Sequence, residues 1–461
     1  MQSDISNALI FDCVYDPYKG VVAYIKVLNG SFKTGDKVYL IHCANTITIT
    51  EVGHFDPEYK SDPSLNQGQI GYVVTGEKSI RNIEIGDTII GGVKNIDIQE
   101  VKQYIIPGFK KIKPYVYAGI YPIDNNDYQK LKNGLEKLTL NDSSIEYELE
   151  DSKALGFGFR CGFLGMLHMD IVKERLFREQ KVETIFTIPT VVYLVKSKTL
   201  NIDQIKLGVN VQNLIKSGLY KYILNKEIDE KEIINSPEII EILKPWLVVR
   251  SGSDMIDHGM IDEIFEPIAN VEIVGPQEYA GNIMALCQDY RGKLEKMDYL
   301  DNDRVVWYYT MPMGEILIDF YDKLKSCTKG YATMNYEFKK YQKADLIKLD
   351  IFINNEKVEA LSWVVHKDKS YYLGREVVEK LKNLIPRHMF TIPIQAGIGT
   401  KIIARETIPA MRKDVIAKCY GGDVTRKRKL LAKQKEGKKK MKALGSVNIP
   451  SDIFIKMVIR D

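Results

Sequence analysis

The sequence predicts a multidomain α+β protein: an antiparallel β-barrel, then two ferredoxin-like (βαββαβ) domains and a mixed α/β C-terminal domain ending in a basic helix. Three observations predict this. Short β-rich runs fill residues 7–100, one order of elements occurs twice after them, and cations gather near the C-terminus. The chain has 461 residues, of which 45% are hydrophobic, so it is long enough for several domains and apolar enough for several cores.

The first predicted domain is the β-barrel, residues 1–105. Five runs rich in β-branched and aromatic residues cover 8–16, 20–30, 36–43, 46–53 and 69–76. Glycines punctuate these runs at Gly20, Gly30, Gly35, Gly53 and Gly71. Short strands at close spacing with turn residues between them are typical of a small antiparallel barrel.

The second predicted domain is ferredoxin-like and covers residues 106–196. Its expected elements are a strand, a helix, two strands, a helix and a strand, at 113–123, 126–140, 145–150, 154–160, 163–180 and 184–195. The second helix has apolar residues at helical spacing, and we expect one face to carry Leu164, Leu167, Ile171, Val172 and Leu176. The order is that of the split βαβ motif.

The same order recurs in residues 265–345, the third predicted domain. Its expected elements lie at 268–275, 279–290, 294–300, 304–312, 315–327 and 332–342. The two domains resemble each other in the order of their elements and not in residue identity. Between them, residues 197–264 are interpreted as an insertion or linker with possible helices at 201–218 and 236–246.

The C-terminal domain, residues 346–461, has an unusual charge distribution. Residues 401–461 hold seventeen Lys or Arg against six Asp or Glu, although the whole chain has a net charge of only +4. The segment 425–442 has ten cations and the single acid Glu436. As a helix it would be about 27 Å long. Its like charges repel one another unless an anionic partner such as nucleic-acid phosphate binds.

We interpret this end of the chain as an RNA-binding surface. A solvated, partly disordered tail and a membrane-surface helix are the alternatives, and the thin apolar strip at Leu430, Leu431, Met441 and Leu444 argues against the second. Arg387 and His388 could extend the surface, and Gly397 and Gly399 either let backbone N–H groups approach a phosphate or merely turn the chain. The candidate RNA-binding residues are Lys401, Arg405, Arg412, Lys413, Lys418, Arg426, Lys427, Arg428, Lys429, Lys433, Lys435, Lys438, Lys439, Lys440 and Lys442.

Other kinds of site find little support in the sequence. The cysteines form no CxxC pair, so we expect no metal site and a reducing compartment; they are Cys13, Cys43, Cys161, Cys287, Cys327 and Cys419. No phosphate-binding loop is present, since the stretch from Gly71 to Ser79 has an extra residue before its lysine and no helix after it. NKEID (225–229) and DYRG (289–292) fit nucleotide-binding motifs too poorly to count. His168 could be a general base, but a structural histidine near a helix start is the favoured interpretation.

Several long strings resemble one family closely. They are PGFKKIKPYVYAGIYPID (107–124), LGFGFRCGFLGMLHMDIVKERL (155–176), IGTKIIARE (398–406) and KCYGGDVTRKRKLLAKQKEGKKKMKALG (418–445). They resemble the LepA family of bacterial translation factors, also called elongation factor 4 or back-translocase. EPIANVEIVGPQEYAGNIM (266–284) resembles the fifth domain of elongation factor G. The resemblance covers most of the chain apart from roughly 196–262.

The resemblance implies a function in translation. Family members bind the ribosome, hydrolyse GTP with Mg²⁺ in an N-terminal domain, and are proposed to move tRNAs backward. The expected partners are therefore ribosomal RNA, ribosomal proteins and tRNA, and the expected location is the cytoplasm, on ribosomes or at the inner membrane face. We expect a monomer off the ribosome that lacks the GTPase domain, holds no cofactor and is inactive as an enzyme by itself. Two rival hypotheses are GTP hydrolysis at an unrecognised site and a free-standing RNA-binding or ribosome-assembly protein.

Overall fold

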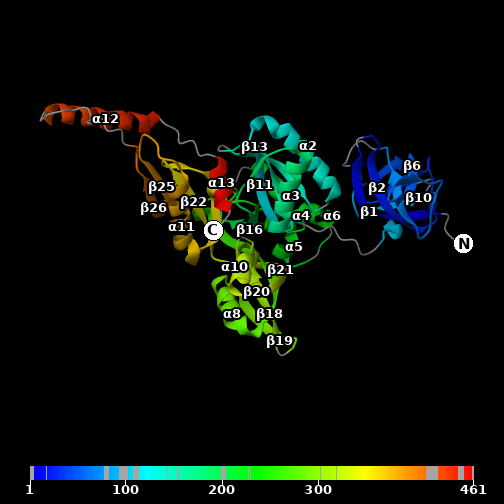
Figure 1. Ribbon diagram of the computed structural model, residues 1–461. Helices are drawn as coiled ribbons and strands as arrows, with labels where there is room; N and C mark the ends of the chain where they lie inside the picture. Colours follow the sequence, from blue (N-terminus) through cyan, green and yellow to red (C-terminus); the bar gives the residue numbers. More distant parts are fainter. Residues whose placement is uncertain are drawn as a thin grey trace. The chain divides into compact units, whose positions relative to one another are not determined.

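The computed structural model describes most of the chain. The described residues are 5–16, 18–76, 83–92, 102–106, 114–142, 144–152, 155–198, 204–226, 228, 230–301, 303–317, 319–411, 424–444 and 451–458. They form two compact units, the first made of residues 1–114, 124–148 and 161–184, and the second of 115–123, 149–160 and 185–461. The protein is a multidomain α+β structure with several antiparallel sheets, as predicted (Figure 1).

The N-terminal part of the first unit is an eight-stranded sheet in the order β5-β4-β10-β1-β2-β9-β6-β7. A small two-stranded sheet, β3-β8, accompanies it. Its inward side chains, among them Ile10, Ile25 and Val73, are fully buried in one core. A closed barrel stays a prediction. The strands are β1 (Ser6–Asp16), β2 (Gly20–Asn29), β3 (Ser31–Phe32), β4 (Lys37–Leu40), β5 (Asn45–Thr48), β6 (Glu51–Asp56), β7 (Glu58–Ser61), β8 (Leu65–Asn66), β9 (Ile70–Val74) and β10 (Thr88–Gly91).

The first unit also contains two helices, α2 (Tyr128–Asn141) and α3 (Met166–Gln180), and the short turns η2 (Lys102–Tyr104) and η3 (Asn125–Asp127). The helices approach closely at Gly134, where an added Cβ would lie 3.0 Å from Leu176 Cδ2. The buried face of α3 is Met169, Val172 and Leu176. The predicted face was partly wrong, because Leu167 is 74% and Ile171 is 47% exposed. The predicted and the buried residues both recur at helical spacing, so the sequence of α3 alone does not show which of them face α2.

The second unit begins with a sheet in the order β12-β13-β11-β14, in which β15 also pairs with β11. The expected strand at 184–195 is divided into three. Pro189 lacks an N–H and lies at the first interruption, and the last piece, β16, pairs with β17 and β18 in another sheet. The strands are β11 (Val116–Pro122), β12 (Glu146–Ser152), β13 (Gly156–Phe163), β14 (Thr184–Phe186), β15 (Thr190–Val191) and β16 (Tyr193–Ser197).

The second sheet of this unit has the order β17-β16-β18-β20-β19, with β21 paired to the other side of β18. Along the chain its elements follow the order expected for 265–345, except that two helices, α9 and α10, stand where one was expected at 315–327. They are β18 (Ile261–Pro276), η5 (Gln277–Tyr279), α8 (Ala280–Asp289), β19 (Lys293–Tyr299), β20 (Arg304–Pro312), α9 (Met313–Ile316), α10 (Phe320–Cys327) and β21 (Thr333–Lys343).

Residues 197–264 are more than a linker. Their described residues form four helices and a strand that extends the second sheet. Leu214, Ile233 and Leu243 pack with Leu194 and Trp246 in a core of their own. Both predicted helices are present in the described residues, and the one expected at 236–246 is shorter, Pro237–Leu243. The elements are α4 (Gln204–Ser217), α5 (Tyr220–Leu224), α6 (Glu230–Asn235), α7 (Pro237–Leu243), β17 (Trp246–Val249) and η4 (His258–Met260).

The C-terminal region has a sheet in the order β23-β22-β25-β26, with β24 paired to β22. The long helix α11 lies against it and buries Val377, Val378 and Leu381 (Figure 1). The elements are β22 (Leu346–Ile353), β23 (Glu356–Lys357), η6 (Glu359–Leu361), β24 (Trp363–His366), η7 (Lys367–Lys369), α11 (Ser370–Leu384), β25 (Ile392–Ile398), β26 (Lys401–Ile408), α12 (Val424–Leu444) and α13 (Ser451–Val458).

The prediction that this region ends in the basic helix was wrong. Helix α13 follows it and buries Ile453, Phe454 and Met457 in the same core as α11. The basic segment is thus followed in the chain by a helix that packs into the C-terminal core. In the described part of the chain, no helix is both long enough and apolar enough to span a membrane.

Candidate nucleic-acid interface

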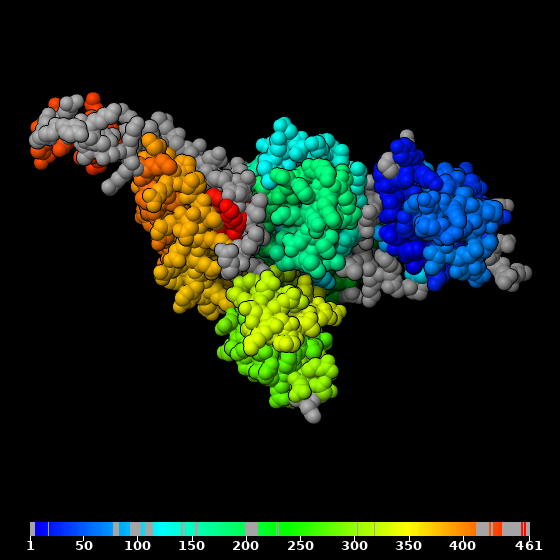
Figure 2. Space-filling view, viewed as in Figure 1, coloured from blue at the N-terminus to red at the C-terminus, as the bar shows by residue number. Residues whose placement is uncertain are grey.

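Strand β26 presents two of the predicted RNA-binding residues. Lys401 and Arg405 are exposed on this strand, which is at the edge of its sheet and is seen in orange at the surface of the second unit (Figure 2). Cations on an edge strand also discourage pairing with a second sheet, so a purely structural role would explain them as well. Glu406, next to Arg405 on the strand, accepts a hydrogen bond from Lys382 Nζ at 2.7 Å, which lowers the pKa of its carboxyl group.

The glycines before Lys401 form the hairpin that places β26. Gly399 has a φ of +57° and begins the turn between Ile398 and Lys401, a conformation that favours glycine. At Gly397 an added Cβ would lie 3.2 Å from Ile402 Cδ1, so the strands approach closely there. Both positions are therefore explained by the hairpin itself, which favours the turn interpretation over phosphate contact.

The predicted basic helix is present as α12, and its 21 residues extend it to about 31 Å. Arg428, Lys429, Lys433 and Lys435 are exposed, and Lys427 is half-buried. Among the α12 side chains that the structure describes, these five cations have no acidic group within 4.0 Å. Many lysines and arginines elsewhere in the chain do pair with an acid, as Lys382 does with Glu406. A row of exposed cations without internal counter-charges is what a polyanion would neutralise.

The remaining predicted residues are not described. Arg412, Lys413 and Lys418 lie outside the described residues. The backbone of α12 is described over its whole length, but the side chains of Arg426, Lys438, Lys439, Lys440 and Lys442 are not. Of the two residues proposed to extend the surface, Arg387 is exposed, whereas His388 is half-buried with its ring centroid 5.9 Å from that of Phe390.

His168 has the environment of a structural histidine. Its Nδ1 accepts a hydrogen bond from the Leu164 backbone N–H at 3.1 Å, so the ring proton is on Nε2, which lies 3.0 Å from Asp142 Oδ2. The hydrogen bond from His168, together with two from Ser144, lowers the pKa of Asp142 to about 2. Nδ1 therefore holds the chain just before α3, and Nε2 faces Asp142 at the end of α2, so both nitrogens have neighbours within the fold, as expected for a structural histidine.

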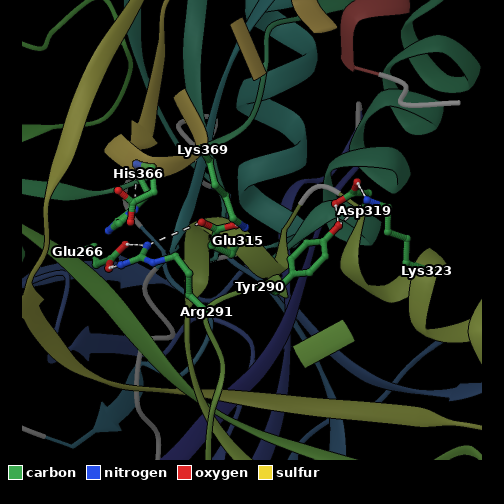
Figure 3. Close-up of polar contacts among 9 residues, drawn as sticks. Glu266, Tyr290, Arg291, Glu315, Asp319, Lys323, His366 and Lys369 are labelled. Carbon is green, nitrogen blue, oxygen red and sulfur yellow. Dashed lines mark hydrogen bonds and ion pairs between the residues drawn. The ribbon is translucent and has the colours of Figure 1, made fainter. Parts of the chain in front are cut away.

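The second unit has a larger cluster of charged groups, shown in Figure 3. Arg291 donates to both oxygens of Glu266, at 2.5 and 3.1 Å, and also lies 3.7 Å from Glu315. Lys369 Nζ donates to the other Glu315 oxygen at 2.8 Å. Burial raises the pKa of the Glu266 carboxyl, against the opposing effect of Arg291. In the sequence only the DYRG string points to this region, and the structure uses its arginine for an internal ion pair.

Figure 3 also shows a second group of paired acids and cations, around Tyr290. Tyr290 donates to Asp319 Oδ1 at 2.6 Å and accepts from Lys323 Nζ at 2.7 Å, while Lys323 also pairs with Asp319 at 2.8 Å. Lys369 Nζ lies 5.1 Å from the Tyr290 ring centroid and so connects the two groups. Acids and cations alternate throughout, as in a structural network, so we do not choose this cluster as the functional site.

Two family models match the C-terminal half of the chain. Residues 263–352 match the elongation factor G C-terminus, and residues 353–459 match the C-terminus of the GTP-binding protein LepA. The second match contains β26, α12 and α13, and the boundary between the matches lies at the end of β22.

Curated relatives match nearly the whole chain. A protein from Hydrogenobaculum sp. (strain Y04AAS1) is 45% identical over 453 residues, and one from Desulfitobacterium hafniense is 45% identical over 455 residues. Each match covers 98% of this chain and 67% of the relative. A protein from Bacillus cytotoxicus is 44% identical over 455 residues, covering 99% of this chain and 67% of the relative. All three are named elongation factor 4, and at this identity and coverage the chain belongs to the elongation factor 4 (LepA) family.

Proposed function

We propose that this chain is the ribosome- and tRNA-binding body of an elongation factor 4, and that α12 with the β26 edge is its RNA-binding surface. The single observation that carries the proposal is the set of exposed cations on α12 that have no acidic partner within 4.0 Å among the side chains that the structure describes. It lies inside the part of the chain that matches the LepA C-terminus. Phosphates of RNA would neutralise these cations and release condensed counterions, which is the main source of non-specific affinity for nucleic acids.

The finer features of the family are part of the same proposal. We assign residues 1–105 to a translation-factor barrel, 106–196 and 265–345 to ferredoxin-like domains, 197–264 to an elaborated insertion, and 346–461 to the LepA-specific domain. The strand order β19-β20-β18-β21 supports the second ferredoxin-like assignment. Backward movement of tRNA and hydrolysis of Mg²⁺–GTP are activities that the resemblance implies for the family. We assign neither to a residue of this chain, whose 461 residues contain no phosphate-binding loop. A cytoplasmic, ribosome-associated monomer fits this role.

Charge reversal on α12 tests the proposal. The test variant changes Arg428, Lys429, Lys433 and Lys435 to Glu, all of which are exposed. Binding to tRNA and to 70S ribosomes is measured by co-sedimentation and fluorescence anisotropy between about 50 and 200 mM salt. We expect affinity to fall at least about tenfold. The slope of log affinity against log salt should fall by about one unit for each phosphate that is no longer neutralised.

A matched control distinguishes the loss of a specific RNA-binding site from the effect of a lower net charge. Changing Lys137, Lys181, Lys293 and Lys340 to Glu alters net charge by the same amount, and all four are exposed but lie outside α12 and β26. We expect this control to retain near-native affinity at physiological salt. Equal losses in both variants would show that only net charge matters and would remove α12 as the RNA-binding element. Binding to tRNA without binding to ribosomes would instead favour a free-standing RNA-binding protein.

A further inference from the structure

The loop of residues 250–257 joins β17 to η4 and contacts several strands at once. On one side it contacts β13 through Arg160, which is only 8% exposed. The Arg160 guanidinium donates to Asp254 and to Ser251 Oγ of the loop, the latter at 3.0 Å, and also to Glu150 of β12. Burial alone would lower the pKa of Arg160, but Asp254 and Glu150 more than offset it and the pKa is raised. Thr190 of β15 donates to the Arg250 carbonyl.

On its other side the same loop contacts the C-terminal sheet. Lys348 of β22 is 6% exposed and donates from Nζ to the Met255 carbonyl oxygen at 2.8 Å. Burial lowers the pKa of this ammonium group, partly offset by Asp350. The Met255 side chain is itself only 3% exposed. A buried ammonium without a partner is costly, so Lys348 holds the Met255 carbonyl of the loop beside β22.

Gly252 makes the closest contact of the loop. An added Cβ would lie 2.1 Å from the Ser362 carbonyl oxygen, a backbone atom that no side-chain rotation can move away. Ser362 is held in turn, since its Oγ donates to Asp350 Oδ1 at 2.9 Å and Lys357 Nζ lies 3.0 Å from Asp350 Oδ2. Any larger residue at position 252 must therefore push the loop away from the C-terminal sheet.

The two sheets that the loop contacts also share an apolar core. Tyr121 of β11 and Ile185 of β14 belong to the same buried cluster as Leu349 and Ile351 of β22. Burial of apolar surface is non-directional and holds two sheets together without fixing the angle between them. Hydrogen bonds and ion pairs are directional, so the loop contacts supply the restraint that the core lacks.

We infer that the 250–257 loop is a clamp that fixes the orientation of the C-terminal sheet relative to the β11–β14 sheet. Arg160, Gly252 and Lys348 are then positioning residues for the RNA-binding surface. The inference rests on the proposed function in one respect: β26 belongs to the sheet that is fixed. A partner that contacts several parts of the chain at once, such as the ribosome, senses this orientation. A short RNA that contacts one surface does not, because simultaneous binding at two sites requires matching geometry.

The test compares two ligands for the same variants of the full chain. Lys348→Met removes the ammonium and retains the side-chain volume, and Gly252→Ala introduces the clash with Ser362. Leu324→Ala is the control, because it leaves a cavity in the fully buried Leu324 site of α10, away from the loop. We expect both clamp variants to bind tRNA as the unaltered chain does and to lose about tenfold or more in 70S affinity. The control should retain both affinities below its unfolding temperature.

A distance measurement tests the clamp without any RNA. Spin labels attached through non-natural amino acids replace Phe157 of β13 and Tyr372 of α11, which are 68% and 76% exposed. We expect Lys348→Met to broaden or shift the distance distribution between them, and Leu324→Ala to leave it unchanged. An unchanged distribution in both clamp variants, or parallel losses of tRNA and ribosome affinity, would overturn the inference. Failure of the unaltered chain to bind either ligand would refute the proposed function, and the distance result would still decide on the clamp.

Discussion

Helix α12 and the buried ion pairs of the second unit use the same residue types in opposite ways. Arg428, Lys429 and Lys433 of α12 are exposed and have no acidic partner within 4.0 Å among the described residues. Arg160, in contrast, is buried and Arg291 is half-buried, and each lies beside two carboxylates. A cation in water costs the fold little, whereas a buried one must be neutralised. The environment therefore separates cations available to a partner from cations that stabilise the fold.

The largest effect is expected from breaking the Glu266–Arg291 pair. Arg291→Met would leave the Glu266 carboxylate, which is only 5% exposed, without its cation. We expect a loss of about 3 kcal/mol in the free energy of unfolding of this region. Amide exchange of β18 and β20 against urea concentration would measure it. The matching double variant, Glu266→Gln with Arg291→Met, should recover much of the loss because the buried carboxylate is removed together with its cation, while Glu315 keeps its ion pair with Lys369.

The pH dependence of Arg291→Met gives an independent check. The pKa of Glu266 is already raised by burial and would rise further without Arg291. A raised carboxyl pKa means that the folded state binds the proton more tightly than the unfolded state. The destabilisation should therefore be full at neutral pH, shrink as the pH falls through the raised pKa, and vanish below the unfolded value of about 4.3. A loss that does not change with pH would show that packing, not charge, is responsible.

A smaller loss in the free energy of unfolding is expected when the polar contact between α2 and α3 is removed. The pKa of Asp142 is lowered to about 2 by His168 and Ser144, so its contribution is present above the unfolded value of about 3.9. We expect this contribution to disappear as the pH falls from about 4 to about 2. Because Asp142 is partly solvated, Asp142→Asn should cost only on the order of 1 kcal/mol at neutral pH. Exchange of α3 amides would measure it, with the exposed Asp170→Asn as the control; equal losses would contradict a specific contact.

The comparison also explains how much the sequence could predict. Most helices and strands in 113–183 and 268–342, and the basic helix, were predictable because each is a local pattern in one run of residues, whereas the division of the expected strand at 184–195 was not. The exposed cations of α12 were predictable for the same reason. The Arg160–Asp254 pair joins residues 94 positions apart, and Lys348 reaches Met255 across 93, so nothing local indicates either contact.

Two further features have a local signal that was not sufficient to predict them. The amphipathic run with Ile453, Phe454 and Met457 indicates the helix α13, but the stronger charge signal of the preceding segment led to the prediction that the chain ends in a basic helix. In α3 the apolar residues offer two adjacent stripes at helical spacing. Met169 and Val172 are buried and Leu167 is exposed, and only the neighbouring elements decide between them.

The smallest effect on stability, and one of opposite sign to the effect on binding, is expected at a single position of α12. Lys429 and Lys433 are exposed and lie four residues apart on the helix, where like charges repel. Lys429→Glu would place a carboxylate one turn before Lys433, the favourable orientation for a helical ion pair, and should stabilise α12 by about 0.3 kcal/mol. The same change should weaken tRNA binding because it removes one potential phosphate ligand and adds an anion. Lys429→Gln, which relieves the repulsion without adding a pair, should fall between the two in both respects. Amide exchange across α12 and tRNA affinity, measured on the same samples, give the two signs. If Lys429→Glu made the helix less stable as well as weakening tRNA binding, Lys429 would stabilise the folded helix. The contrast between the cations of α12 and those of the buried ion pairs would then be wrong.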